Sequence, residues 1–231
     1  MNVNRRFVLK GMALSGIAGL AMGGSLRALA GTAATANDAS TGGHPVVALA
    51  NEGAVELAFL HGAMKASGSR LRVQRVSRDL AFMLDFERQV RSRQATRIIG
   101  LLDDASATLV VAMARSAGAR VQWLGQHTAE AGFTRHHLLT TELAEGCSRQ
   151  LSRHLHACGA GFSLNEERHN GSMAPRQLTG PACSGNQSAQ WAASIGHLLA
   201  SLGARPALAT PLAPATSKPV TGRFASFSIA A

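Results

Sequence analysis

Tyrosine is absent from this 231-residue chain and tryptophan occurs only twice, so aromatic residues make up 4% of the sequence. Proteins that bind single-stranded nucleic acid usually stack the bases on aromatic side chains beside basic grooves. An arginine-rich stretch runs from Arg70 to Arg97, but Asp79, Asp85 and Glu87 interrupt it. The composition therefore argues against a nucleic-acid-binding protein, although the net charge is +10.

The common glycine-rich motifs of nucleotide enzymes are missing as well. Neither G-x-G-x-x-G nor G-x-x-x-x-G-K-[ST] follows any candidate strand. These motifs bring backbone N–H groups close to phosphates, so their absence argues against a common nucleotide enzyme. The G-x-S-x-G turn, which exposes the nucleophilic serine of an α/β-hydrolase, is also absent.

The first 30 residues have the order of an export signal. A charged segment, Asn4-Arg5-Arg6-Phe7-Val8-Leu9-Lys10, precedes an uncharged run rich in glycine and alanine, from Gly11 to Gly24. Ala28-Leu29-Ala30 then forms a small-residue cleavage pattern, which predicts a cut between Ala30 and Gly31.

This segment resembles a twin-arginine (Tat) signal peptide, whose pattern is Ser/Thr-Arg-Arg-x-Phe-Leu-Lys. Arg5, Arg6, Leu9 and Lys10 fit that pattern, whereas Asn4 and Val8 depart from it. The resemblance covers residues 1–30 alone, and it implies a bacterial protein that the Tat translocase exports to the periplasm already folded. The alternatives are an ordinary secretory signal and a retained anchor, but the apolar run is short and glycine-rich for spanning about 30 Å of hydrocarbon. We expect no stable membrane anchor.

The residues after the signal suit one domain. Residues 31–43 are small and polar, which is typical of a disordered leader. Removing residues 1–30 takes away four basic residues and no acidic one, so the net charge falls from +10 to +6. An apolar content of 46% is enough for a core, and we expect one domain over residues 44–231, with a proline-rich segment at residues 203–222.

Apolar periodicity predicts alternating strands and helices along this domain. The expected strands are residues 45–50, 71–76, 97–102, 120–124, 137–141, 161–168 and 224–229. The expected helices are residues 52–67, 79–94, 105–117, 142–157 and 188–202, and residues 170–187 read as a long loop. Alternation of this kind predicts an α/β fold with a mainly parallel sheet covered by helices. Residues 46–102 and 137–229 both read βαβαβ, so two similar halves are one version of this fold.

Asp103 and Asp104 follow the most apolar strand and open a helix. One aspartate can cap that helix while the other benefits from its positive N-terminal end. Ligands of doubly wound sheets bind outside the carboxyl ends of the strands, so contact with a ligand is the alternative. Gln126 and His127 follow the next expected strand, and we expect all four residues to line any pocket at this edge.

The three cysteines are Cys147, Cys158 and Cys183. Cys147 shares a four-residue repeat with Leu143, Leu151 and Leu155, which is typical of a core position on a helix. The periplasm favours disulfides, and the candidate pair is Cys158–Cys183, with an unpaired set as the alternative.

Six of the nine histidines fall between residues 127 and 169. His154 and Cys158 are four residues apart on a helix and could share a zinc or copper ion, whereas His156 points about 200° away from His154. No C-x-x-C or H-x-x-x-H motif supplies further ligands. We therefore expect no metal or other cofactor and regard these histidines as solvated surface residues.

Two classes of function remain. The first is a non-catalytic periplasmic protein that binds a small molecule or assists another periplasmic protein. The second is a metal- or cofactor-binding periplasmic redox protein. The missing cofactor motifs favour the first class, so we lean against an enzyme.

Overall fold

The computed structural model describes residues 45–92, 94, 96–141, 144, 146–157, 161–169, 174–181, 189–203 and 220–231. All of them belong to one compact unit, Gly42–Ala231. The proposed signal and leader, and most of the proline-rich segment, lie outside the described residues.

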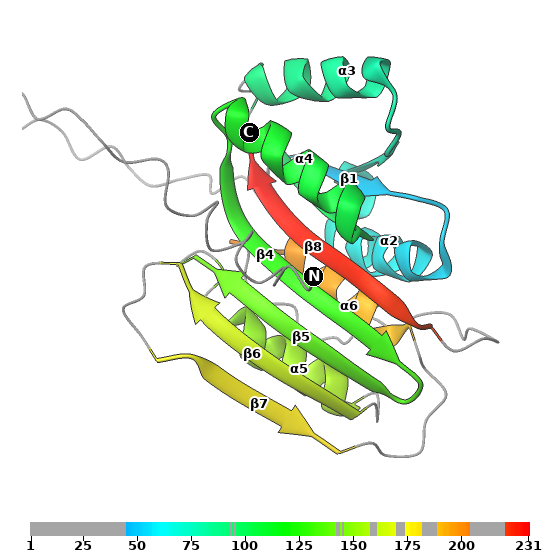
Figure 1. Ribbon diagram of the computed structural model, residues 1–231, viewed down its shortest axis with the longest axis vertical. Helices are drawn as coiled ribbons and strands as arrows, with labels where there is room; N and C mark the ends of the chain where they lie inside the picture. The colour runs from blue at the N-terminus through cyan, green and yellow to red at the C-terminus, as the bar shows by residue number, and fades with distance from the viewer. Residues whose placement is uncertain are drawn as a thin grey trace, which may run out of the picture. The chain divides into compact units, whose positions relative to one another are not determined.

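Strands and helices alternate through most of this unit (Figure 1). In chain order the elements are β1 (Val46–Ala50), α2 (Ala54–Ser67), the 3-10 helix η1 (Gly68–Arg70), β2 (Leu71–Arg75), α3 (Leu80–Arg91), β3 (Arg97–Asp103), α4 (Asp104–Ser116), β4 (Arg120–Glu130), β5 (Phe133–Thr140), α5 (Cys147–Ala157), β6 (Gly161–Arg168), β7 (Arg176–Gly180), α6 (Gln190–Ala200) and β8 (Gly222–Ala230). The predicted α/β class is confirmed.

The eight strands form one mixed sheet in the order β2-β1-β3-β8-β4-β5-β6-β7. The neighbours β1–β2, β1–β3 and β5–β6 are parallel, and the other four pairs are antiparallel. The prediction of a mainly parallel sheet is therefore wrong. The last strand, β8, inserts between β3 and β4 and runs antiparallel to both. No local sequence pattern predicts this arrangement.

A missed hairpin accounts for another part of the error. β4 continues six residues beyond its predicted end at Leu124, and only two residues separate it from β5. Gly132 has φ +75° at this turn, a conformation that favours glycine. The second half of the chain also contains β7, inside the stretch expected to be a loop, so the proposal of two βαβαβ halves is wrong.

Helices cover both faces of the sheet. On the face that we call the back, α2, α5 and α6 share one apolar core with alternate sheet residues such as Ile99, Trp123 and Leu138. On the opposite, front face, α4 packs against β3, β8 and β4, and α3 packs against α4 (Figure 1). None of the described helices packs on the front of β5, β6 or β7.

The helices α2 and α6 cross at very short range. A Cβ atom on Gly62 would lie 1.9 Å from the Ala193 carbonyl oxygen, and one on Gly196 would lie 2.0 Å from the Phe59 carbonyl oxygen. Only glycine permits backbones to approach this closely. The crossing fixes α6, every residue of which is buried, against the back of the sheet.

Candidate functional site

The strands β1 and β3 are parallel neighbours, but the chain leaves their carboxyl ends in opposite directions. After β1 it enters α2 on the back face, and after β3 it enters α4 on the front face. Ligands of open α/β sheets bind in the crevice at such a switch point. The described residues at the carboxyl ends of β1 and β3 include Asp103, Asp104, Glu56 and Arg78.

Asp103 is the N-cap of α4, as one of the two sequence interpretations predicts. Its Oδ1 accepts hydrogen bonds from the backbone N–H groups of Ala105 (3.1 Å) and Ser106 (3.0 Å), and the Arg78 Nη2 lies 3.5 Å away. Burial acts to raise the pKa of Asp103, but the hydrogen bonds from Ser106, the charge of Arg78 and the Ala105 N–H outweigh it and lower the pKa. Asp104 lies exposed in the first turn of the helix. Capping therefore occupies the carboxylate that was also a candidate ligand contact.

Glu56 is a second acidic group at this edge, and the sequence alone did not single it out. It lies in the first turn of α2 and is 7% exposed. Burial raises its pKa, its own backbone N–H lowers it, and the nearby charge of Asp103 raises it further. Gly53, the N-cap of α2, makes no side-chain cap, so the Glu56 carboxylate folded back towards it serves the helix end.

Gln126 and His127 do not join this acidic group in one pocket. Asp103 and His127 are level in the sheet, because both pair with Phe224 of β8, but β8 separates their strands. Consecutive residues of a strand point to opposite faces. Gln126 is exposed on the front, whereas His127 is buried on the back, so the predicted four-residue pocket is wrong. The error follows from ending the strand at Leu124.

His127 instead belongs to a buried chain of hydrogen bonds between β8, β4 and β5. Its Nε2 lies 2.7 Å from the Ser226 Oγ, and its Nδ1 lies 2.9 Å from the His136 Nδ1. The His136 Nε2 lies 2.9 Å from the Thr134 Oγ1, and the Trp123 Nε1–H donates to the Ser226 Oγ at 2.9 Å. We call Ser226, His127, His136 and Thr134 the serine–histidine chain.

The donors in this chain follow from Ser226. Because Ser226 accepts from Trp123, its own hydroxyl hydrogen is best used by donating to the His127 Nε2. His127 then carries its proton on Nδ1 and donates to the His136 Nδ1, and the His136 Nε2–H donates to Thr134. With this direction of donation, the hydroxyl hydrogen of Ser226 has an acceptor, although Ser226 is 0% exposed and out of reach of water.

Both histidines of the chain are held neutral. Burial lowers the pKa of His136 to about 3, and burial together with the neighbouring His136 lowers the pKa of His127 well below its ordinary value. The Trp191 ring of α6 covers both imidazoles, with ring centroids 5.4 Å and 5.7 Å away. A serine hydrogen-bonded to a histidine is the arrangement of a nucleophile and its base. Here, however, these groups lie under α6 and are hydrogen-bonded to one another.

A second histidine pair lies between α5 and α6. His154 is 4% exposed, and its ring centroid is 6.2 Å from that of His197, also 4% exposed. Burial, His197 and Arg153 lower the pKa of His154 to about 4, and burial lowers the pKa of His197 despite the nearby Gly62 carbonyl. His154, His127 and His136 are thus interior residues, and the interpretation as solvated surface histidines is wrong for all three.

The expected opposition of His154 and His156 is confirmed, because His156 is exposed while His154 is buried. Cys158, the other half of the alternative zinc or copper site, lies outside the described residues. His197 is the neighbour that the sequence did not indicate. No group of three or more histidine, cysteine, aspartate or glutamate side chains in the described part of the chain could hold a metal ion.

The two histidine pairs border a row of buried polar groups on α6. Trp191, Ser194 and His197 recur every three residues, and their side-chain nitrogen or oxygen atoms have no hydrogen-bond partner in the described residues. Each such group carries a cost of about 1–3 kcal/mol. The helix α6 therefore buries more polar side-chain atoms than its apolar sequence suggests.

Cys147 begins α5 and packs partly buried against the core, as its leucine repeat predicts, and it is a free thiol. Burial and the charge of Glu166 raise its pKa to about 11. Glu166 is itself buried on β6, where it accepts hydrogen bonds from Thr140 (3.0 Å) and Ser148 and pairs with Arg176 at 3.4 Å. A thiol with so high a pKa is a poor nucleophile at neutral pH.

The remaining predicted sites lie outside the described residues. They are the signal residues Arg5, Arg6, Leu9 and Lys10, the cleavage residues Ala28, Ala30 and Gly31, and the candidate disulfide Cys158–Cys183. Among the helices that are described, none is both long and apolar enough to cross a membrane.

Ser226 and His197, which sequence reasoning missed, have partners that are far away in the chain. Ser226 lies 99 residues from His127, and His197 lies 43 positions beyond His154. The clean alternation of residues 224–229 predicts the strand that holds Ser226, but it does not indicate which strands flank it. Searches of family models, curated proteins and solved structures found no match to this chain.

Proposed function

We propose that this chain is a Tat-exported periplasmic protein that acts by binding rather than by catalysis. The Tat translocase is its partner during export, and a small molecule or another periplasmic protein is its partner afterwards. The proposal of export rests on the segment from Asn4 to Lys10 and the cleavage pattern at Ala28–Ala30.

The observation that supports a non-catalytic function is that the polar side-chain atoms of the serine–histidine chain already have hydrogen-bond partners. Ser226, His127 and His136 are between 0% and 2% exposed, and their polar atoms serve Trp123, Thr134 and one another. A reacting group must reach its substrate within hydrogen-bond distance, and these groups have the packed surroundings of structural residues. At the switch point between β1 and β3, Asp103 caps a helix, which leaves Arg78 and Asp104 as exposed polar groups for a small ligand.

Export can be tested with a conservative double substitution, Arg5→Lys together with Arg6→Lys. The Tat receptor reads the guanidinium pair, so we expect the mature-size protein to disappear from the periplasmic fraction while precursor accumulates in the cytoplasm. Arg27→Lys, near the predicted cut, is the matched control and should leave delivery unchanged. Mature-size periplasmic protein in the double variant, or in a strain without the Tat translocase, would exclude Tat export.

The second candidate function is that of a metal-binding redox protein, and the His154–His197 pair supports it. Two buried, neutral imidazoles on neighbouring helices are ligands that zinc or copper accepts. They provide two ligands, whereas a structural zinc site takes four. The first candidate is therefore preferred.

A further inference from the structure

One edge of the sheet of described strands is formed by β2. β2 pairs only with β1 among the described strands. The Val76 N–H donates to the Ala50 carbonyl oxygen at 3.3 Å, so residue 76 directs its backbone polar groups towards β1. Alternation along a strand then directs those of Arg72 and Gln74 the same way, and those of Leu71, Val73 and Arg75 towards the open edge.

An exposed apolar side chain, that of Val73, lies on this edge strand. The large hydrophobic residues that the structure leaves exposed all fall between residues 57 and 84: Leu57, Met64, Val73, Leu80 and Leu84. Val73 is 53% exposed on the back face, whereas Leu57 and Met64 lie on the side of α2 opposite its buried residues. Proteins usually protect or cover a free sheet edge, so an exposed valine on an edge strand favours a contact there.

The same edge is cationic. Arg70, Arg72 and Arg75 are exposed, and Arg75 pairs with Glu52. Arg72 points to the front face and has no ion pair with any described residue. Pairing β2 with β2 of a second copy in the register that sets Arg72 opposite Arg72 would place like charges against one another, which is destabilising. Charge complementarity therefore favours an acidic occupant over a second copy.

We propose that the β2 edge binds an extended, acidic segment of another protein as an added strand. The segment would exchange backbone hydrogen bonds with Val73 and Arg75, because the Leu71 N–H already donates to the Gly68 carbonyl oxygen. Because side chains alternate, its apolar residues would lie beside Val73 on the back face and its acidic residues beside Arg72 on the front. This inference rests on the proposed function, since it names the surface through which a binding protein would act.

The test uses the purified full chain and a fluorescent eight-residue peptide of alternating valine and glutamate, with the valine–lysine peptide as its counterpart. We expect saturable binding of the acidic peptide only, weakened by salt. Val73→Pro should abolish binding, because proline removes an outward N–H and leaves the bonds to β1 in place. Arg72→Glu should weaken binding at least tenfold.

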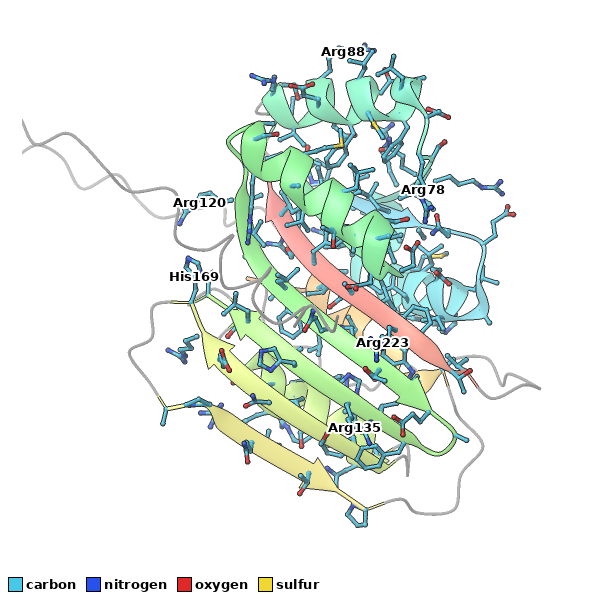
Figure 2. All side chains as sticks on the ribbon, viewed as in Figure 1. Arg78, Arg88, Arg120, Arg135, His169 and Arg223 are labelled. Carbon is cyan, nitrogen blue, oxygen red and sulfur yellow. The ribbon has the colours of Figure 1, made fainter. Side chains whose placement is uncertain are left out.

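Arg223→Glu is the matched control, because Arg223 is an exposed arginine at the start of β8, and Figure 2 shows it well away from Arg78, which follows β2. Melting curves confirm that each variant is folded, and Arg72→Glu decides the question if Val73→Pro does not fold.

Equal loss of binding in Arg223→Glu, unchanged binding in Arg72→Glu, or no saturable binding would overturn the proposal. Dimers of the unliganded chain that Arg72→Glu strengthens would identify a second copy as the occupant instead. Export is measured separately, so either proposal can fail without the other.

Discussion

The Ser226 Oγ makes two hydrogen bonds within the serine–histidine chain and its surroundings. Its hydroxyl accepts from the Trp123 indole and donates to the His127 imidazole, and it is 0% exposed. Satisfied polar networks of this kind fix the arrangement of the strands that carry them, here β4, β5 and β8. Losing one member leaves the remaining groups desolvated without a partner.

Ser226→Ala should therefore lower the free energy of unfolding by about 1–3 kcal/mol for each of the two groups that it orphans. Ser228→Ala is the control on the same strand and face. Ser228 is equally buried but donates only one hydrogen bond of 3.3 Å, to Gln122, so the loss should be about 1 kcal/mol. Urea unfolding of both variants measures the difference, and equal losses would show that the serine–histidine chain is not cooperative.

The buried histidines make stability depend on pH in a definite direction. Burial lowers the folded-state pKa of His136 to about 3 and that of His154 to about 4, below the unfolded value of about 6.5. The folded state then binds fewer protons than the unfolded state. Stability is complete above pH 6.5 and should be lost as the pH falls from 6.5 towards those folded-state values.

Urea unfolding at pH 7.5, 6.0 and 5.0 should show this loss before most carboxylates begin to protonate. His154→Gln removes one of the groups, so the slope below pH 6 should fall by up to about 1.4 kcal/mol per pH unit. His137→Gln, which removes a partly exposed histidine, is the control. Stability that rises as the pH falls from 7.5 to 5.0 would contradict neutral burial of these residues.

At the scale of secondary-structure elements, the crossing of α2 and α6 determines how the back of the sheet is covered. Gly62 and Gly196 each face a carbonyl oxygen of the opposite helix, so an added methyl group meets backbone rather than a side chain that could turn aside. Backbone can yield only if the helices separate. Separation would expose the apolar core that α6 shares with the sheet.

Gly62→Ala and Gly196→Ala should each cost about 3 kcal/mol or more, at the upper end of overpacking changes. Gly68→Ala is the comparison, because Gly68 ends α2 with φ +56° and no atom lies within 4 Å of its added Cβ. Its cost should be about 1 kcal/mol and conformational in origin. Thermal melts of the three variants give the ranking, and a small effect at Gly62 would show that the two helices are further apart.

At the scale of the whole molecule, the sequence predicts local elements better than their neighbours. The limits of residues 161–168 match β6, and those of residues 97–102 fall one residue short of β3. The sheet order is not local, because β8 returns from the end of the chain to lie between β3 and β4. Hydrophobic periodicity reports which face of an element is buried, and it carries no information about which strand lies alongside.

The candidate site shows the same limit. Capping by Asp103 is predictable because the cap and the helix are adjacent in sequence. The partners of His127 and His154 are not, because Ser226 and His197 come from distant elements. A strand predicted to end at Leu124 places Gln126 and His127 in the same pocket. Long-range pairing therefore decides which polar residues meet.

The central claim is that this chain acts by binding and that its buried histidines are structural. It is tested most directly by elemental analysis of protein purified from the periplasm, beside thermal melts with and without a chelator. Because His154 is buried, His154→Gln should lower the melting temperature even if no metal is present. We predict no stoichiometric metal and a melting temperature that the chelator leaves unchanged. About one equivalent of zinc or copper, lost in both His154→Gln and His197→Gln and accompanied by a lower melting temperature with chelator, would contradict the account.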